Sequence, residues 1–151
     1  MYEHEIRELS AQPVAFIRFQ SRPDELGARF GEILPMVFRY VGSTGIAPAG
    51  APYARYLSMT DETFDIEAGI PVVSTVPPGG RIESGELPGG RVVYTLHVGP
   101  YDKLGDAHDA VNKWIAEEGL EISGPPWEYY VSDPMEAPPA EWETEIYYPI
   151  A

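Results

Sequence analysis

The two halves of this chain carry the same features in the same order, and this internal repeat constrains the fold more than any other property. The aligned segments are 14–19 with 92–97, 52–56 with 126–130, 64–67 with 142–145, and 71–72 with 149–150. Short apolar matches also arise by chance, but chance does not readily produce a whole ordered series whose small offset changes fall in loops. Each half is therefore predicted to form a strand, a helix and two further strands.

Two amphipathic helices are expected, one in each half. The first begins near Pro23 and ends at Gly42 and Gly45, with Pro35 as a predicted kink. Its apolar face is predicted to contain Leu26, Phe30, Ile33, Leu34, Val37 and Phe38. The second begins near Pro100 and ends at Gly119. Its apolar stripe is predicted to contain Leu104, Ala107, His108, Val111, Trp114 and Ile115.

Segments rich in β-branched and aromatic residues predict the strands. They are 3–9, 14–19, 53–59, 63–73, 81–87, 91–98, 127–131 and 141–150. The turn signal Pro88-Gly89-Gly90 predicts a hairpin between the strands on either side of it. Together these elements predict an α+β fold in which two pseudo-symmetric modules form one largely antiparallel sheet, with two main helices and a central ligand groove. A single domain is expected over residues 1–151, with the repeat covering approximately 14–73 and 92–150.

Charge and composition exclude several classes of function. The chain of 151 residues has 24 acidic and 10 basic side chains and a net charge of −14, so direct binding to nucleic acid is not expected. It has no cysteine, which excludes disulfides, thiolate metal sites and cysteine nucleophiles. No segment has the length of apolar sequence that a membrane span needs, and no secretory signal is recognised at the N-terminus. A cytoplasmic protein is expected.

The three histidines, His4, His97 and His108, are scattered through the sequence without the spacing of a metal site. His108 lies on the stripe of the second helix, where packing or capping is the expected role. The paired glycines lack the lysine and hydroxyl residues of a phosphate-binding loop. We therefore expect neither a metal nor a cofactor.

Several motifs together resemble the GyrI-like small-molecule-binding domain, which also serves as the effector-binding part of AraC- and MerR-type multidrug regulators. They are 65–72, 99–104, 114–115, 124–130, 133–134 and 144–150. No single motif is specific, but the ordered set covers nearly the whole chain. The repeat leaves no room for a helix-turn-helix domain, so the resemblance implies a stand-alone ligand-binding form.

The resemblance implies that Glu128 is the central site residue, because the family's glutamate in this motif contacts lipophilic cations at the base of an aromatic pocket. A carboxylate within an aromatic strand attracts cations, and aromatic faces add to that attraction. The alternative is a strand glutamate that faces solvent. The other predicted ligand-binding residues are Tyr130, Tyr56, Tyr94, Glu145 and Tyr147, for which the alternative is ordinary core packing.

Three functions remain open. The favoured one is uptake of lipophilic, cationic or aromatic compounds, for drug sequestration or sensing, because Glu128 has no positioned catalytic partner in the sequence. The second, implied by hydrolases of similar sequence, is the opening of cyclopropane-type alkylating natural products, with Glu128 as base and Tyr130 as acid or oxyanion partner. The third is an acidic module that binds a protein partner such as gyrase through Asp106, Asp109, Glu117 and Glu118. The oligomeric state is left open.

Overall fold

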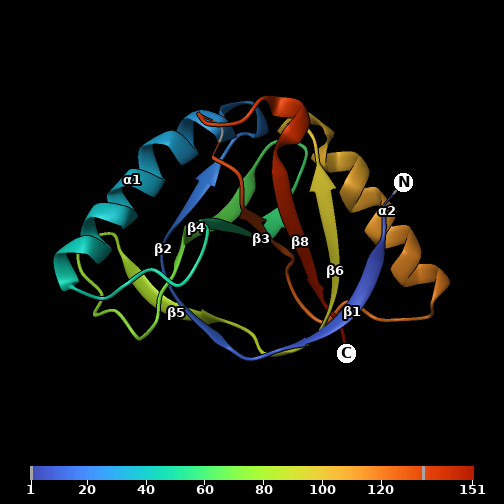
Figure 1. The fold of residues 1–151 in the computed structure, drawn as a ribbon, viewed down its shortest axis with the longest axis horizontal. Coiled ribbons are helices and arrows are strands. Elements are labelled where there is room, and N and C mark those ends of the chain that lie inside the picture. The colour runs from blue at the N-terminus through green and yellow to red at the C-terminus, as the bar shows by residue number, and fades with distance from the viewer. Residues whose placement is uncertain (1, 134) are drawn as a thin grey trace. The chain divides into compact units, whose positions relative to one another are not determined.

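The computed structural model describes residues 2–133 and 135–151, so Met1 and Pro134, the latter part of a motif noted above, lie outside the described residues. The chain divides into two compact units (Figure 1). Unit 1 comprises Met1–Ser10 and Gly89–Ala151, and unit 2 comprises Ala11–Pro88. Each unit contains one half of the repeat predicted from the sequence.

Unit 2 is a four-stranded antiparallel sheet with one long helix. Its elements are β2 (Gln12–Ser21), the 3-10 turn η1 (Pro23–Glu25), α1 (Leu26–Thr44), β3 (Tyr53–Met59), β4 (Phe64–Pro71) and β5 (Glu83–Leu87). The strand order is β5-β2-β4-β3, with every neighbouring pair antiparallel. Helix α1 packs against β2 and β4 (Figure 1) and buries Ile33, Val37 and Val41.

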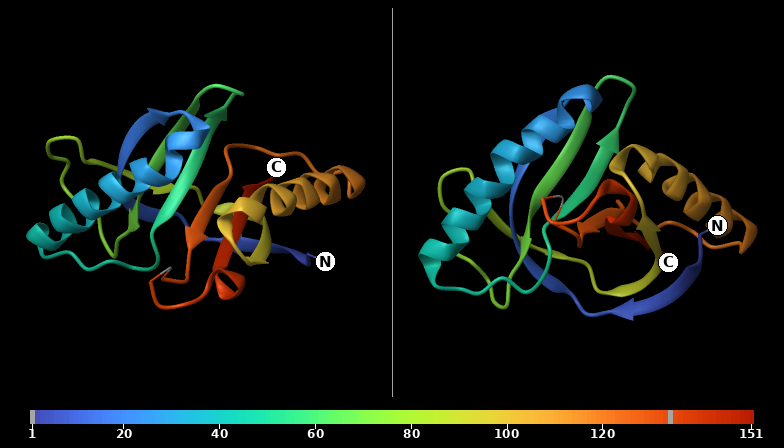
Figure 2. Two further views of the ribbon diagram at one scale, coloured as in Figure 1. Left: turned by 90° about the horizontal axis from the view of Figure 1, so that it is seen from above. Right: turned by 45° about the horizontal axis from the view of Figure 1, so that its top comes forward.

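Unit 1 repeats this arrangement with a shorter helix. Its elements are β1 (His4–Leu9), β6 (Gly90–Val98), η2 (Tyr101–Lys103), α2 (Leu104–Glu117), β7 (Trp127–Tyr130), η3 (Pro139–Glu141) and β8 (Glu143–Pro149). The order β1-β6-β8-β7 is again antiparallel throughout. Figure 2 gives two further views of α2, which packs against β6. In both units the first strand of the repeat pairs with the third, and the third pairs with the second. The α+β class and the strand–helix–strand–strand modules are confirmed.

The core of unit 1 lies between α2 and one face of its sheet. From the helix come Ala107, Val111 and Ile115, at one-turn spacing, and from the strands come Val93, Ile146 and Tyr148. Each large apolar side chain buried in this way contributes about 1.5–3 kcal/mol. Gly119, at φ 69°, follows the helix in the left-handed conformation that glycine adopts without a steric penalty. The predicted stripe of α2 therefore sets which of its side chains meet the sheet.

Three expectations from the sequence are corrected. The strands that flank Pro88-Gly89-Gly90 do not form a hairpin, because β5 pairs with β2 while β6 lies between β1 and β8. Phe38 is 42% exposed instead of packing with the apolar face of α1, which is completed by Val41. Gly42 lies inside α1, which continues to Thr44 and is capped by Gly45 at φ 77°.

Among the described residues, neither helix combines the length and apolar character that crossing a bilayer requires. The described part of the chain also has no cluster of three or more histidine or acidic side chains suited to a metal ion.

Candidate functional site

Strand alternation places Glu128 on the face of the unit 1 sheet that carries α2. Glu128 pairs with Ile146 across β7 and β8, and Ile146 belongs to the core cluster with the helix. The Glu128 side chain is only 2% exposed. The solvent-facing alternative is therefore wrong, and a buried carboxylate needs compensating partners.

Both carboxylate oxygens of Glu128 have a partner. Nε2 of His108 lies 2.5 Å from Oε2, and the hydroxyl of Tyr130 donates to Oε1 at 2.7 Å. His108 is supplied by α2, whereas Tyr130 lies two residues along β7 and so shares the face of Glu128. The structure brings Glu128 and Tyr130 together as alternation predicted.

A second layer of polar side chains holds His108. Its Nδ1 lies 2.6 Å from the hydroxyl of Tyr148, which also accepts a hydrogen bond of 3.2 Å from Nδ2 of Asn112. That same Asn112 amide nitrogen donates to the backbone carbonyl of His108 at 2.8 Å. Burial raises the pKa of Tyr148 to about 12, and the charge of Glu128 adds to the rise. We refer to Glu128, Tyr130, His108, Tyr148 and Asn112 as the Glu128 network.

The Glu128 network includes a residue whose function the sequence interpretation missed. Packing or capping was expected of His108, but its side chain is 19% exposed and pairs with Glu128. The two residues are 20 positions apart in sequence, in a helix and a strand, so no local spacing marks the pair. The signal was only that a polar residue sits within the apolar stripe of α2.

Aromatic rings extend this site toward the start of the helix. The ring centroid of Tyr101 lies 5.7 Å from that of Tyr130 and 4.6 Å from that of Trp142. Burial raises the pKa of Tyr101, and the charges of Asp133 and Glu128 add to this effect. Beside Tyr130 on β8, Thr144 is fully buried, and its hydroxyl has no hydrogen-bond partner among the described residues.

Three other predicted residues, Tyr94, Glu145 and Tyr147, gather on the opposite face of the unit 1 sheet. The ring centroids of Tyr94 and Tyr147 are 5.3 Å apart, and the Tyr147 hydroxyl donates to Glu145 at 3.2 Å. Trp127 stacks on Tyr147 at a centroid distance of 5.7 Å. The guanidinium carbon of Arg7 lies 3.6 Å from the centre of the Tyr94 ring. Within unit 1, the predicted ligand residues thus form two groups on opposite faces of the sheet.

The sixth predicted residue, Tyr56, belongs to unit 2. It lies on β3 opposite Ile66, next to a register shift before Ser58, and its ring meets that of Phe64 edge to face at 6.4 Å. Its approach to Glu128 stays a prediction. The acidic side chains proposed for a protein partner, Asp106, Asp109, Glu117 and Glu118, are exposed on α2 or just beyond it.

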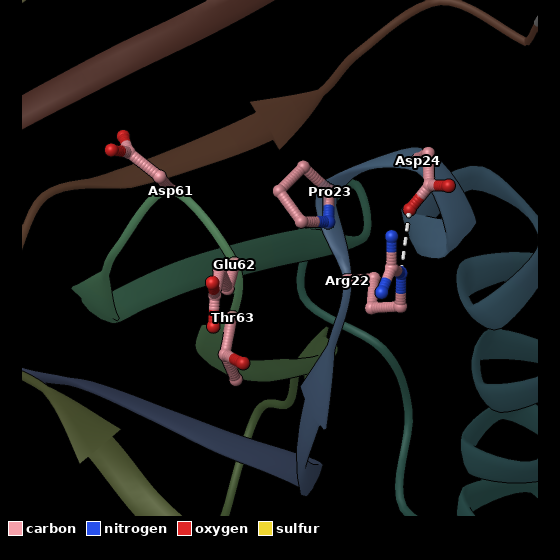
Figure 3. Close-up of a pocket in the computed structure, with 6 residues that line it drawn as sticks. All are labelled: Arg22, Pro23, Asp24, Asp61, Glu62 and Thr63. Atoms are coloured by element: carbon pink, nitrogen blue, oxygen red, sulfur yellow. Dashed lines mark hydrogen bonds and ion pairs between the residues drawn. The ribbon is translucent and has the colours of Figure 1, made fainter.

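Two surface hollows lie away from the Glu128 network. One, of about 570 Å³ in unit 2, lies between the η1 turn and the loop that joins β3 to β4 (Figure 3). Its Arg22–Asp24 pair, at 3.2 Å, is 68% and 71% exposed, so water screens it and it contributes little. The other, of about 680 Å³ in unit 1, is lined by Glu3, His4, Glu5, Tyr94 and Leu96. Neither hollow is lined by Glu128.

Comparison with known families decides what kind of domain this is. The model of the GyrI-like small-molecule-binding domain matches residues 2–151. The chain belongs to the GyrI-like family. It is therefore a small-molecule-binding domain. Among curated proteins, no significant match is found.

Several solved structures share this fold at low sequence identity. The EcmrR C-terminal domain is 22% identical with a TM-score of 0.89, and the match covers 100% of this chain and 98% of that one. In the complex of EcmrR with DNA, the matched region is 57% of the EcmrR chain, so this chain spans little more than half of that protein.

Two further proteins of similar fold are a hydrolase and a protein with a bound lipophilic cation. A hydrolase from Listeria innocua is 14% identical with a TM-score of 0.68, covering 99% of this chain and 92% of that one. SAV2435, solved with bound tetraphenylphosphonium, is 10% identical with a TM-score of 0.71, covering 99% and 94%. At these identities the likeness concerns the fold.

Proposed function

We propose that the chain takes up lipophilic compounds, cationic or aromatic, at Glu128. The observation that carries this proposal is a carboxylate with 2% exposure that contacts His108 and Tyr130, next to the aromatic ring of Tyr101. A delocalised cation loses little hydration energy on burial and gains from both the carboxylate and the aromatic faces. Tyr101, Tyr130 and the buried hydroxyl of Thr144 are the groups nearest to such a ligand.

The relatives support this chemistry. SAV2435 is bound to tetraphenylphosphonium, a lipophilic monocation, and it shares the fold over nearly the whole chain. The C-terminal domain of EcmrR, a protein that has been solved in a complex with DNA, has the same fold. We accordingly propose a cytoplasmic role in sequestering or sensing such compounds, with any contact to DNA made through another protein or segment.

Calorimetric titration with tetraphenylphosphonium tests the proposal. We expect saturable binding that Glu128→Gln weakens by about tenfold or more, because one charge-assisted contact contributes at least about 1.4 kcal/mol. Glu145→Gln is the matched control, since it removes the same charge from the opposite face of the same sheet. The absence of saturable binding, or an equal loss in both variants, would rule out the Glu128 site.

Hydrolysis is the second candidate, and the contacts of Glu128 favour it specifically. Strand alternation already placed Tyr130 beside this carboxylate, and the structure adds His108, a histidine partner that the sequence did not reveal. In a cyclopropane opening, water oxygen would bond to a ring carbon as a ring C–C bond breaks toward the attached electron-withdrawing group. The Glu128–His108 pair would accept the proton of the attacking water. Tyr130 would stabilise or protonate the oxygen of the electron-withdrawing group, which receives the electrons of the broken ring bond.

Product analysis separates the two candidates. Incubation with a cyclopropane-containing alkylating compound in ¹⁸O-labelled water should give a ring-opened product carrying one labelled oxygen if the chain is a hydrolase. Turnover should be lost in Glu128→Ala. Recovery of unchanged compound at a stoichiometry of one per chain would establish binding without catalysis.

A further inference from the structure

We propose that His108 is the internal counter-ion of the Glu128 site, so that binding of a lipophilic cation competes with protonation of His108 and releases a proton wherever the pH is low enough for His108 to be charged. This inference rests on the proposed binding function and adds to it the charge class of the ligand and the residue that sets it. It starts from the 2.5 Å contact between Nε2 of His108 and Oε2 of Glu128.

Hydrogen-bond directions in the Glu128 network assign the resting state of His108. The backbone carbonyl of His108 can only accept a hydrogen bond, so the Asn112 nitrogen that contacts it is the donor Nδ2. The same nitrogen donates its second hydrogen bond to the hydroxyl oxygen of Tyr148. The Tyr148 proton then points to Nδ1 of His108, its hydrogen-bond acceptor among the described contacts. Nδ1 is thereby unprotonated and Nε2 donates to Glu128, which makes the imidazole neutral and the carboxylate anionic.

This assignment gives the five side chains of the network one net negative charge. Neutral donors hold both oxygens of Glu128, and burial keeps Tyr148 in its phenol form because its pKa is raised to about 12. A monocation beside Glu128 would neutralise that charge. A dication would leave an uncompensated positive charge in a buried site, which is costly.

Protonation of His108 neutralises the same charge from within. Among the contacts described above, the titratable or charged groups that adjoin this part of the network are Glu128 and Tyr130 from β7, Tyr148 from β8, Tyr101 from η2 and Asp109 from the helix of His108. A proton added at Nδ1 would remove the acceptor of the Tyr148 hydroxyl. The side chain is 19% exposed, which gives solvent protons a route to the ring. The site is thus open to a cation when His108 is neutral and closed when it is charged.

Tetraphenylphosphonium affinity measured between about pH 8 and about pH 5.5 tests this coupling, because imidazoles ordinarily titrate near pH 6.5. In the wild type the affinity should fall by about tenfold for each pH unit in the acidic range, as one linked proton requires. At about pH 5.5, titrations in buffers of different ionisation enthalpy should count up to about one proton released per cation bound, and at about pH 8 they should count almost none. His108→Gln keeps an N–H donor for Glu128 but cannot titrate, so its affinity should stay nearly constant over this range.

Controls and ligand-free spectra separate the possible outcomes. His4→Gln, on β1, should retain the wild-type pH dependence. Nitrogen chemical shifts of His108 in the ligand-free protein at about pH 8 should show a protonated Nε2 and a bare Nδ1. If the cation binds with the same pH dependence in His108→Gln, or if the wild type releases no proton at about pH 5.5, the inference is wrong while the binding function stands. If no cation binds at any pH, both fail.

Discussion

The hydroxyl of Tyr130 donates a hydrogen bond of 2.7 Å to Oε1 of Glu128, two residues earlier on the same strand. A hydrogen bond to a buried charged group contributes about 1.5–3 kcal/mol. We therefore expect Tyr130→Phe to lower the free energy of unfolding by about that amount, measured by urea denaturation at neutral pH.

A double-mutant cycle checks that this loss comes from the charged pair. In the background of Glu128→Gln, which removes the charge, Tyr130→Phe should cost about 1 kcal/mol or less, since the remaining bond is neutral. Equal losses in the two backgrounds would mean that the Tyr130 hydroxyl does not stabilise the Glu128 charge.

The Glu128–Tyr130 contact could be predicted from sequence because strands have a side-chain period of two. Once Trp127–Tyr130 is recognised as a strand, these two side chains must share a face. The same rule separates Glu128 from Glu145, since the register pairs Glu128 with Ile146 and Tyr129 with Glu145. The sequence does not reveal that register, so the six candidates could not be assigned to faces in advance.

The histidine partner of Glu128 could not be predicted, because this contact depends on how α2 is rotated over the sheet. Helical spacing places His108 beside the buried Ala107 and Val111, which is equally consistent with simple packing. The pairing of β5 with β2, and of β1 with β6, could not be predicted from the sequence either. The turn signal at Pro88-Gly89-Gly90 is local, whereas the observed pairings of β5 with β2 and β1 with β6 are long-range and use the first strand of each repeat.

The close approach of Gly69 to Ala15 predicts a second sensitive position, in unit 2. A Cβ atom added to Gly69 on β4 would lie 1.9 Å from the carbonyl oxygen of Ala15 on β2. The carbonyl oxygen of Ala15 belongs to the backbone of β2, which pairs with β4 in the middle of the unit 2 sheet. It cannot move away without disturbing the hydrogen bonds between these two strands. Gly69→Ala should therefore destabilise the protein by about 2 kcal/mol or more, the range of severe overpacking.

Gly105 supplies the matched control for that substitution. It lies inside α2, and a Cβ built there meets nothing within 4 Å. Gly105→Ala should raise the free energy of unfolding by about 0.5–1 kcal/mol, because alanine is the better helix former. Thermal or urea unfolding of both variants measures the difference, and a Gly69→Ala protein as stable as wild type would contradict the packing shown here.

The ion pair between Arg18 and Asp65 predicts a pH-dependent contribution on the acid side. Arg18 donates two hydrogen bonds to Asp65, at 3.1 and 2.7 Å, and these lower the pKa of the Asp65 carboxyl. A lowered folded-state pKa adds stability above the ordinary value of 3.8 and loses it as the pH falls through the folded-state value. Arg18→Gln should be less stable than wild type at neutral pH, by a small amount because Arg18 is 55% exposed. The difference in free energy of unfolding between the two proteins should disappear in strong acid. A difference that stays constant with pH would contradict the role of this ion pair.

Two buried tyrosines predict how stability changes in alkali. Burial raises the pKa of Tyr129 to about 12, with the charge of Glu145 adding to the effect, and burial likewise raises that of Tyr148 to about 12. Both values exceed the ordinary 10.0, so the unfolded chain loses these protons first. Their contribution is complete below pH 10 and is lost as the pH rises toward about 12, with a slope of up to about 1.4 kcal/mol per pH unit for each tyrosine.

Urea denaturation at intervals above pH 9, followed with phenolate absorbance of the native protein, measures this alkaline loss. Tyr129→Phe and Tyr148→Phe should each flatten the decline, because phenylalanine has no proton to lose. Ionisation of every tyrosine in a single step near pH 10, without loss of folded structure, would show that Tyr129 and Tyr148 are not held as buried phenols.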